Sequence, residues 1–253
     1  MRVERDGDIA IVRMEAGKGN AMGRAFLADF KRLFDEVENS DARGVMLTGK
    51  GTFFSVGMAL HELLPLKRDD MRSFLAEVSC SLARLMTFPR PVVAAINGHA
   101  VAGGCVLGLY CDYRVVGSGP WRLGFSEVQI GIGLPPFITE ALRQAVHNPA
   151  DWVAVAHRGR MMSPKEAQSV GLIDEVALGD QLESVALHKV RLLAERPQAA
   201  FAQVKSEYRR PALAAMKVDA DARNEAWLDT WFSDEAQALL KKAVARLGGS
   251  GRS

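Results

Sequence analysis

A glycine-rich turn and one carboxylate that follows it are the residues of this chain best suited to chemistry. Residues 91–112 read PVVAAINGHAVAGGCVLGLYCD, where an apolar run typical of a buried strand leads through Ala102-Gly103-Gly104 into an apolar helix. Glycines at a helix start leave backbone N–H groups free to bind an anion. The next segment, FSEVQIGIG at residues 125–133, contributes the carboxylate of Glu127.

A similar turn lies upstream. Residues 45–48 are typical of a strand, residues 49–51 of a turn, and FFSVGM at residues 53–58 leads into another short helix. Two such turns that converge on one carbonyl oxygen form an oxyanion hole, in which each donor contributes roughly 3–4 kcal/mol to transition-state stabilisation. Each turn alone is equally typical of close strand–helix packing, and Glu127 alone, after Ser126, is more typical of a helix cap.

Five motifs, in this order, resemble those of the crotonase (enoyl-CoA hydratase/isomerase) superfamily over nearly the whole chain. They are GKGNAMG at 17–23, FFSVGMAL at 53–60, INGHAVAGGCVLGLYCD at 96–112, FSEVQIGIGLPP at 125–136 and SPKEAQSVGLIDEV at 163–176. The resemblance implies an α/β fold, a crotonase-like spiral of repeated ββα units with a helical C-terminal region. It also implies a homotrimer or a dimer of trimers.

The resemblance further implies an acyl-CoA thioester substrate, with no cofactor beyond the coenzyme A that is part of that substrate. The thioester carbonyl oxygen is then held by the backbone N–H groups of Met58 and Gly103. The positions that match the substrate-binding residues of the family are Lys18, Ala21, Ser55, Gly57, Leu60, Gly104, Val106 and Ile132.

Departures from the family pattern favour one reaction of the family over the others. Family hydratases use two glutamates to activate water, and Val106 stands where the first of them is expected, whereas Glu127 keeps the second. One carboxylate beside an oxyanion hole suits the removal of a proton next to the thioester and its return elsewhere. The resemblance therefore favours a 3,2-enoyl-CoA isomerase, with the pKa of Glu127 raised by apolar neighbours, for which the candidates are Val106, Phe125, Ile130 and Ile132.

Other reactions remain open from the sequence. A hydratase, a thioester hydrolase or a carbon–carbon lyase can also work from one carboxylate and an oxyanion hole, and a non-catalytic acyl-CoA-binding protein can retain the same fold. Ala59 replaces an aspartate found in many family members and removes a polar group at the site entrance. The backbone donor of Met58 is unaffected by that change, because only proline removes an N–H group.

Several suggestive side chains are given structural interpretations. His61 is expected on a helix surface, His99 in packing or pocket lining, and Trp121 in packing at a strand edge. The candidates for contacts with the CoA phosphates are Lys18, Arg24 and Lys67. No metal is expected, because metal-ligand spacing is missing among the remaining histidines, which are His147, His157 and His188.

The composition is that of an enzyme without a nucleic-acid partner. The chain has 253 residues, 48% hydrophobic and 25% charged, and its formal net charge of +2 creates no field that favours nucleic acid. Three cysteines in apolar contexts, Cys80, Cys105 and Cys111, indicate reduced core residues. No signal sequence or membrane span is recognisable, which favours a cytoplasmic protein.

Strand and helix patterns alternate as in repeated crossover units. Strands are expected at 9–14, 45–48, 92–96 and 113–116, and helices at 23–38, 71–86, 150–157, 164–170, 182–193, 198–208, 212–232 and 234–247. We expect a spiral core over 1–195, a helical capping or trimerisation region over 196–247 and a disordered tail at 248–253. An aromatic set at helical spacing is expected in the core or an interface: Trp227, Trp231 and Phe232.

Overall fold

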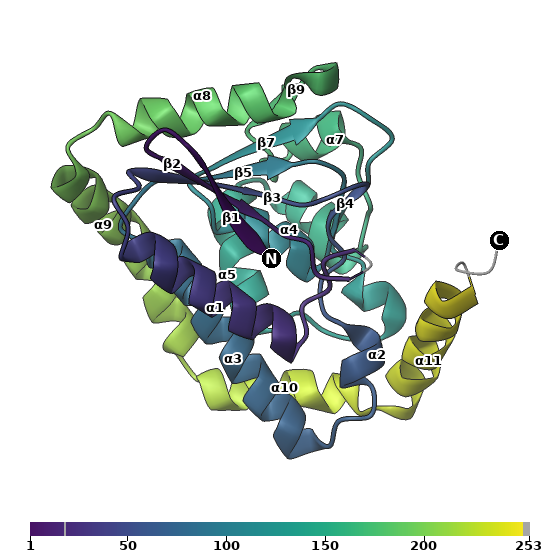
Figure 1. Cartoon of the computed structure of the whole chain (residues 1–253). Helices are drawn as coiled ribbons and strands as arrows, with labels where there is room; N and C mark the ends of the chain where they lie inside the picture. Colours follow the sequence, from purple (N-terminus) through teal and green to yellow (C-terminus); the bar gives the residue numbers. More distant parts are fainter. Residues whose placement is uncertain (18, 250–253) are drawn as a thin grey trace.

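The larger of two sheets forms the centre of the computed structural model, which describes residues 1–17 and 19–249 (Figure 1). Its six strands lie in the order β1-β2-β3-β5-β7-β9, and all neighbours are parallel except the β1–β2 pair. The strands are β1 (Arg2–Asp6), β2 (Ile9–Arg13), β3 (Gly44–Thr48), β5 (Val92–Ile96), β7 (Tyr113–Gly117) and β9 (Glu175–Ala177).

A smaller, wholly parallel sheet contains β4 (Phe53–Ser55), β6 (His99–Val101) and β8 (Leu123–Gly124). Each of its strands follows a strand of the larger sheet and precedes a helix. The helices of these units are α2 (Leu60–Leu63), α3 (Arg68–Thr87), α4 (Gly103–Leu109) and the 3-10 helix η1 (Glu127–Ile130). This repetition of two strands and a helix confirms the α/β spiral expected from the sequence.

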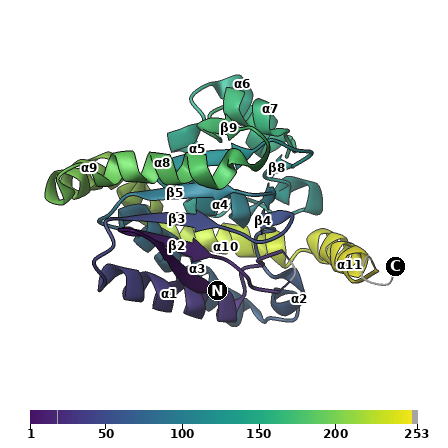
Figure 2. The same ribbon diagram turned by 45° about the horizontal axis from the view of Figure 1, so that its top comes forward.

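The central strands β3 and β5 are buried along their whole length, so both are mostly apolar. In β5, Val92, Ala94 and Ile96 face the main core, whereas Val93 and Ala95 face α8 (Leu182–Ala194). Figure 2 shows α8 lying along this sheet. On the other side, α1 (Arg24–Glu38) buries the apolar positions of its helical period, as the sequence predicts: Phe26, Leu27, Phe30, Leu33, Phe34 and Val37.

The second half of the chain is mostly helical. Its remaining elements are α5 (Pro136–Ala145), α6 (Pro149–Trp152), the π-helix η2 (Val153–His157), α7 (Pro164–Ser169), η3 (Gly179–Gln181), α9 (Gln198–Lys217), α10 (Ala220–Trp231) and α11 (Asp234–Gly249). The helix expected over 150–157 is therefore α6 continued by one π turn. Helix α11 continues two residues past its expected end at 247, and residues 250–253 of the expected tail lie outside the described residues.

The expected helix boundaries around Pro211 and Asp219 are wrong. Helix α9 continues through Pro211, because four buried residues on one face hold it against its neighbours: Lys205, Arg209, Ala212 and Met216. The chain instead breaks at Val218 and Asp219, where Asp219 has a positive φ of 49° and is the N-cap residue before α10. Trp227 and Trp231 of α10 are buried and stacked, as expected for core residues.

The three cysteines divide into two kinds. Cys105 and Cys111 are buried, and burial raises the pKa of each thiol to about 12. Cys80 is exposed, so its assignment to the core was wrong. The reason is its place on α3, which buries Val78 and Leu82 and turns Cys80 to its outer face.

A buried ion pair connects α9 to the larger sheet. Lys205, whose side chain is 5% exposed, donates to the Asp112 carboxylate at 2.7 Å, and the same carboxylate oxygen accepts the Val92 N–H at 2.8 Å. Burial lowers the pKa of the Lys205 ammonium despite the neighbouring carboxylate. Removing one partner of such a pair leaves an uncompensated charge in the interior.

We predict that Lys205→Met lowers the free energy of unfolding by about 3–5 kcal/mol, because Asp112 then stays charged and buried without its partner. Arg210→Met is the matched control on the same helix. It removes an exposed pair with Glu207 and should cost less than about 1 kcal/mol. Urea unfolding followed by circular dichroism measures both, and equal losses would contradict the role given to the buried pair.

Candidate active site

The smaller sheet brings three turns to one edge. Its strands are parallel and in close register, with Ser55 opposite Ala100 and Val101 opposite Gly124. Their carboxyl ends therefore lead, side by side, into residues 56–58, residues 102–104 and residues 125–127. The Met58 and Gly103 amides and the Glu127 carboxylate belong to these three turns. Short strands and glycine turns thus bring together groups that are far apart in the sequence.

The Gly103 turn is held in a strained conformation. Ala102 has a positive φ of 53°, which costs a non-glycine residue on the order of 1–3 kcal/mol. Its N–H donates to the Gly124 carbonyl at 2.8 Å, which fixes the turn against β8. Gly104 permits close packing of α4, because a Cβ there would lie 2.1 Å from the Ser55 carbonyl oxygen. The Gly103 amide is left at the first position of α4.

The Met58 turn lies directly against the Gly103 turn. Gly57 has a positive φ of 83°, and a Cβ on it would lie 3.0 Å from the Gly103 nitrogen. Across residues 1–17 and 19–249, no hydrogen bond is donated by the Met58 or the Gly103 amide. Two neighbouring backbone donors are therefore available to an acceptor.

Glu127 is an almost fully buried carboxyl group. Its exposed fraction is 4%, and its Oε2 atom has no hydrogen-bond partner among the described residues. Desolvation raises the pKa of Glu127 to about 7, which a bond from its own backbone N–H only partly offsets. The Ser126 side chain makes no cap bond to η1, and Glu127 is itself the acidic residue in the first turn of that helix.

The residues expected to surround Glu127 are apolar and inside the protein. Val106, Phe125 and Ile132 are buried in the main core, and Ile130 is partly buried against it. The negative charge of Glu127 helps to raise the pKa of the Cys105 thiol, the residue next to Val106, so the two segments lie close in space. A carboxyl group in such surroundings holds a proton near neutral pH.

A cavity of about 800 Å³ is lined in part by the Met58 turn. Three of the residues expected at the substrate site lie in its wall: Ala21, Met58 and Leu60. Gly103 and Glu127 lie outside its described wall. The methyl carbon of Met22 packs against Gly103, 2.1 Å from where a Cβ would stand.

The other expected substrate-binding residues have mainly packing roles in this structure. The Ser55 hydroxyl is buried, donates to the Asn20 carbonyl at 2.8 Å and accepts the Gly57 N–H at 3.2 Å. Gly57 and Gly104 allow the close backbone contacts described above, and Val106 and Ile132 are core residues. Lys18 lies outside the described residues.

The other two charged candidates, Arg24 and Lys67, lie on the surface. Arg24 donates to Glu77 at 2.7 Å, and Lys67 is exposed at the start of α3. His61 is exposed on α2, as expected, and it also lines the large cavity beside Glu62, 3.7 Å away.

His99 and Trp121 have the packing roles expected of them. The His99 Nδ1 atom accepts the Arg122 N–H at 3.0 Å. Its ring lies 5.2 Å from Phe53 and 5.6 Å from Trp121, measured between ring centroids. His99 thus joins β4, β6 and the segment before β8.

Sequence reasoning missed Asn20 as the organising residue of the first motif. Asn20 has a positive φ of 50°, its side-chain oxygen accepts the Ala16 N–H at 2.9 Å, and its amide donates to the Phe54 carbonyl at 3.0 Å. Asparagine beside glycine is a turn signal that tolerates this conformation, so the residue type alone gave a usable indication. Met22 carried no signal beyond its apolar character.

Metal-binding clusters and membrane-spanning helices are both missing from the described part of the chain. No group of three or more His, Cys, Asp or Glu side chains there has an arrangement able to hold a metal ion. No helix in the same residues is long and apolar enough to cross a bilayer.

Comparison with known proteins places this geometry in a family. Residues 4–243 match the family described as enoyl-CoA hydratase/isomerase. The chain is 27% identical over 242 residues to the human protein named enoyl-CoA delta isomerase 1, mitochondrial, covering 94% of this chain and 80% of that protein. It is 28% identical over 255 residues to a Bacillus subtilis protein named probable enoyl-CoA hydratase, covering 96% of each.

A solved structure gives the same result. The crystal structure of human mitochondrial delta3-delta2-enoyl-CoA isomerase superposes with a TM-score of 0.92 at 27% identity, covering 99% of this chain and 98% of that one. The match extends over both sheets and the C-terminal helices. The chain therefore belongs to the enoyl-CoA hydratase/isomerase family.

Proposed function

We propose that this protein moves the double bond of an enoyl-CoA thioester from position 3 to position 2, with Glu127 as its proton carrier. The observation that carries the proposal is the buried Glu127 carboxyl group, which has one unpartnered oxygen and a pKa raised to about 7. A general base with that pKa is half deprotonated at neutral pH and can both remove and return a proton.

The reaction needs only the groups already described. The Glu127 carboxylate removes a proton from the carbon between the thioester and the double bond, and the electrons move onto the thioester oxygen as an enolate. The Met58 and Gly103 N–H groups donate to that oxygen and stabilise its negative charge. The protonated Glu127 then returns the proton two carbons further along the chain, so no atom is gained or lost. Coenzyme A belongs to the substrate, and no other cofactor is needed.

Val106 supports isomerisation over hydration. A hydratase must position and activate water, and losing a general acid or base commonly costs about 10²–10⁴-fold in rate. Val106 is fully buried on α4 and provides neither an acceptor nor a proton. The likeness to a protein named probable enoyl-CoA hydratase keeps hydration as the second candidate.

We further propose the assembly and the location expected from the sequence. The proposed unit is a homotrimer or a dimer of trimers in which residues 196–247 cap the site or contact neighbouring copies. A cytoplasmic location is proposed as well, although the similar human protein is named as mitochondrial.

The test of the reaction is product analysis in heavy-oxygen water. The purified protein is incubated with a 3-enoyl-CoA and, separately, with a 2-enoyl-CoA, and the products are separated and weighed by mass spectrometry. We expect conversion of the 3-enoyl ester into its isomer without gain of heavy oxygen. Incorporation of heavy oxygen would instead indicate hydration or thioester hydrolysis, chain cleavage would indicate a lyase, and no turnover would favour a binding protein.

We predict that Glu127→Gln abolishes turnover while binding of a CoA ester is retained, because glutamine keeps the size of the side chain but cannot accept the proton. In the unchanged protein, kcat/KM should fall about tenfold per pH unit below about pH 7, as the base becomes protonated. Steady-state kinetics across pH and calorimetric binding measure the two effects. Full activity of Glu127→Gln would refute the mechanism.

A stability measurement checks that this variant is folded. The folded pKa of Glu127 is raised from 4.5 to about 7, so the charged carboxylate weakens the folded state as pH rises through that interval. Glutamine does not titrate. Relative to the unchanged protein, Glu127→Gln should therefore gain on the order of 3 kcal/mol of stability between about pH 4 and pH 8. A constant difference across this range would show that the carboxyl is not desolvated.

We predict that Val106→Glu introduces some hydration of a 2-enoyl-CoA, because it restores a second carboxylate next to the site. The new carboxyl group is buried. The free energy of unfolding of the variant should therefore fall by several kcal/mol, on the order of the cost of an unpaired buried polar group. Val106→Gln is the control, since it has similar size and no acid or base. Heavy-oxygen incorporation measures the gain, and equal incorporation by both variants would contradict the role of the carboxylate.

A further inference from the structure

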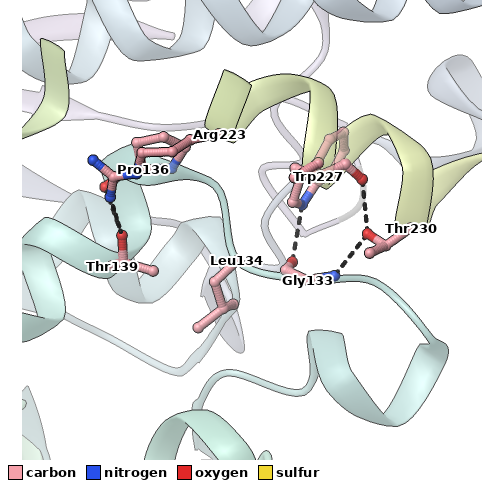
Figure 3. Close-up of a pocket in the computed structure, with 8 residues that line it drawn as sticks. Gly133, Leu134, Pro136, Thr139, Arg223, Trp227 and Thr230 are labelled. Atoms are coloured by element: carbon pink, nitrogen blue, oxygen red, sulfur yellow. Dashed lines mark hydrogen bonds between the residues drawn. The ribbon is translucent and has the colours of Figure 1, made fainter. Parts of the chain in front are cut away.

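A second, smaller cavity lies where the segment after Glu127 meets α10. Its volume is about 280 Å³, and its wall contains Leu134, Pro136 and Thr139 together with Arg223, Trp227 and Thr230 of α10 (Figure 3). Its polar groups already bond to each other, because Arg223 donates to Thr139 and Glu140. The informative feature is therefore the backbone at its edge, at Gly133.

Both backbone groups of Gly133 are bound by side chains of α10 (Figure 3). The Gly133 N–H donates to Thr230 Oγ1 at 3.0 Å, and the Trp227 Nε1–H donates to the Gly133 carbonyl at 2.9 Å. The Thr230 hydroxyl in turn donates to the Trp227 carbonyl at 2.7 Å. These bonds close a ring in which Thr230 is both donor and acceptor, and they fix the position of Gly133 on α10.

Gly133 is in turn connected to Glu127 by a short, bonded stretch of chain. The Ile132 N–H, next to Gly133, donates to the Glu127 carbonyl at 3.1 Å, so the chain after η1 is bonded back to the first residue of that helix. Gly131 lies between Glu127 and Ile132 and has a positive φ of 76°. It packs closely against α11, where a Cβ on Gly131 would lie 3.1 Å from the Ala236 Cα. The backbone of Glu127 is thus held through Ile132 and Gly133 by the C-terminal helices.

Helix α10 is itself firmly placed. Trp227, Leu228 and Trp231 are buried, and the indole rings of the two tryptophans stack with centroids 5.3 Å apart. On its outer side, Glu225 accepts hydrogen bonds from Arg68 at 2.9 Å and from Arg72 at 2.5 Å, both on α3. Because these contacts fix α10, its hydrogen bonds to Gly133 hold the Gly133 backbone in a defined position.

From this geometry we infer that Thr230 is a positioning residue for Glu127, so that the C-terminal helix α10 sets the placement of the base. The inference rests on the proposed role of Glu127. A reacting carboxylate has to lie within a fraction of an ångström of its working position, and misplacement by about 1 Å can cost about 10²-fold in rate. Loss of the Thr230 hydroxyl leaves the Gly133 N–H without its acceptor, so the segment moves to find water.

The test compares Thr230→Val, Thr230→Ser and Thr139→Val. Valine keeps the volume of threonine and removes the hydroxyl, serine keeps the hydroxyl, and Thr139 is a partly buried threonine on the opposite wall of the same cavity. Turnover of a 3-enoyl-CoA is measured across pH, with circular dichroism and thermal unfolding to show that each variant is folded.

For Thr230→Val we expect kcat to fall about 10–100-fold with little change in KM. The apparent pKa in its kcat/KM profile should fall from about 7 toward the ordinary carboxyl range, because water reaches a displaced Glu127. Thr230→Ser should restore both values, and Thr139→Val should change neither. A merely structural role would lower thermal stability without moving the pKa.

Two results would overturn the inference: a kcat and pH profile of Thr230→Val equal to those of Thr139→Val, or a loss that serine does not restore. Glu127→Gln, measured in the same series, separates this failure from failure of the proposed function. If Glu127→Gln is inactive while Thr230→Val is unaffected, only the positioning role is refuted. If Glu127→Gln stays active, the proposed base is refuted instead.

Discussion

The parallel pairing of three very short strands is the constraint on which the site depends. Because β4, β6 and β8 run in the same direction, the segments that leave them must start at one edge. A slip of one residue would turn each of these segments to the opposite face. Register is secured by contacts that only small residues allow, above all the close approach of Gly104 to Ser55 and of Gly57 to Gly103.

Desolvation of Glu127 is the second physical condition of the proposed chemistry. An exposed glutamate would be a weak base with a low pKa, and a deeply buried one without any donor would stay protonated. Glu127 lies between these extremes, since burial raises its pKa to about 7 and a bond from its own backbone N–H limits that rise. The apolar residues expected around Glu127 belong to the main core, so the proposed chemistry would depend on the same packing that stabilises the protein.

The sequence predicted the features that depend on local pattern and missed those that depend on contacts between distant segments. The strand β5, the buried face of α1 and the turns at Met58 and Gly103 all follow from periodicity and glycine placement. The continuation of α9 through Pro211 could not be predicted, because packing outweighs the local preference of proline. The binding of Gly133 by Thr230 joins segments 97 residues apart, and no spacing rule indicates it.

The three thiols differ in accessibility, so one of them, Cys80, can carry a fluorescent label. Cys105 and Cys111 are buried and resist deprotonation, whereas Cys80 is exposed on the outer face of α3. A maleimide dye applied under native conditions would therefore react selectively with Cys80, without any engineered cysteine. Since α3 also carries Arg68 and Arg72, which bind α10, the emission of such a dye would report on the helix pair next to the Gly133 segment.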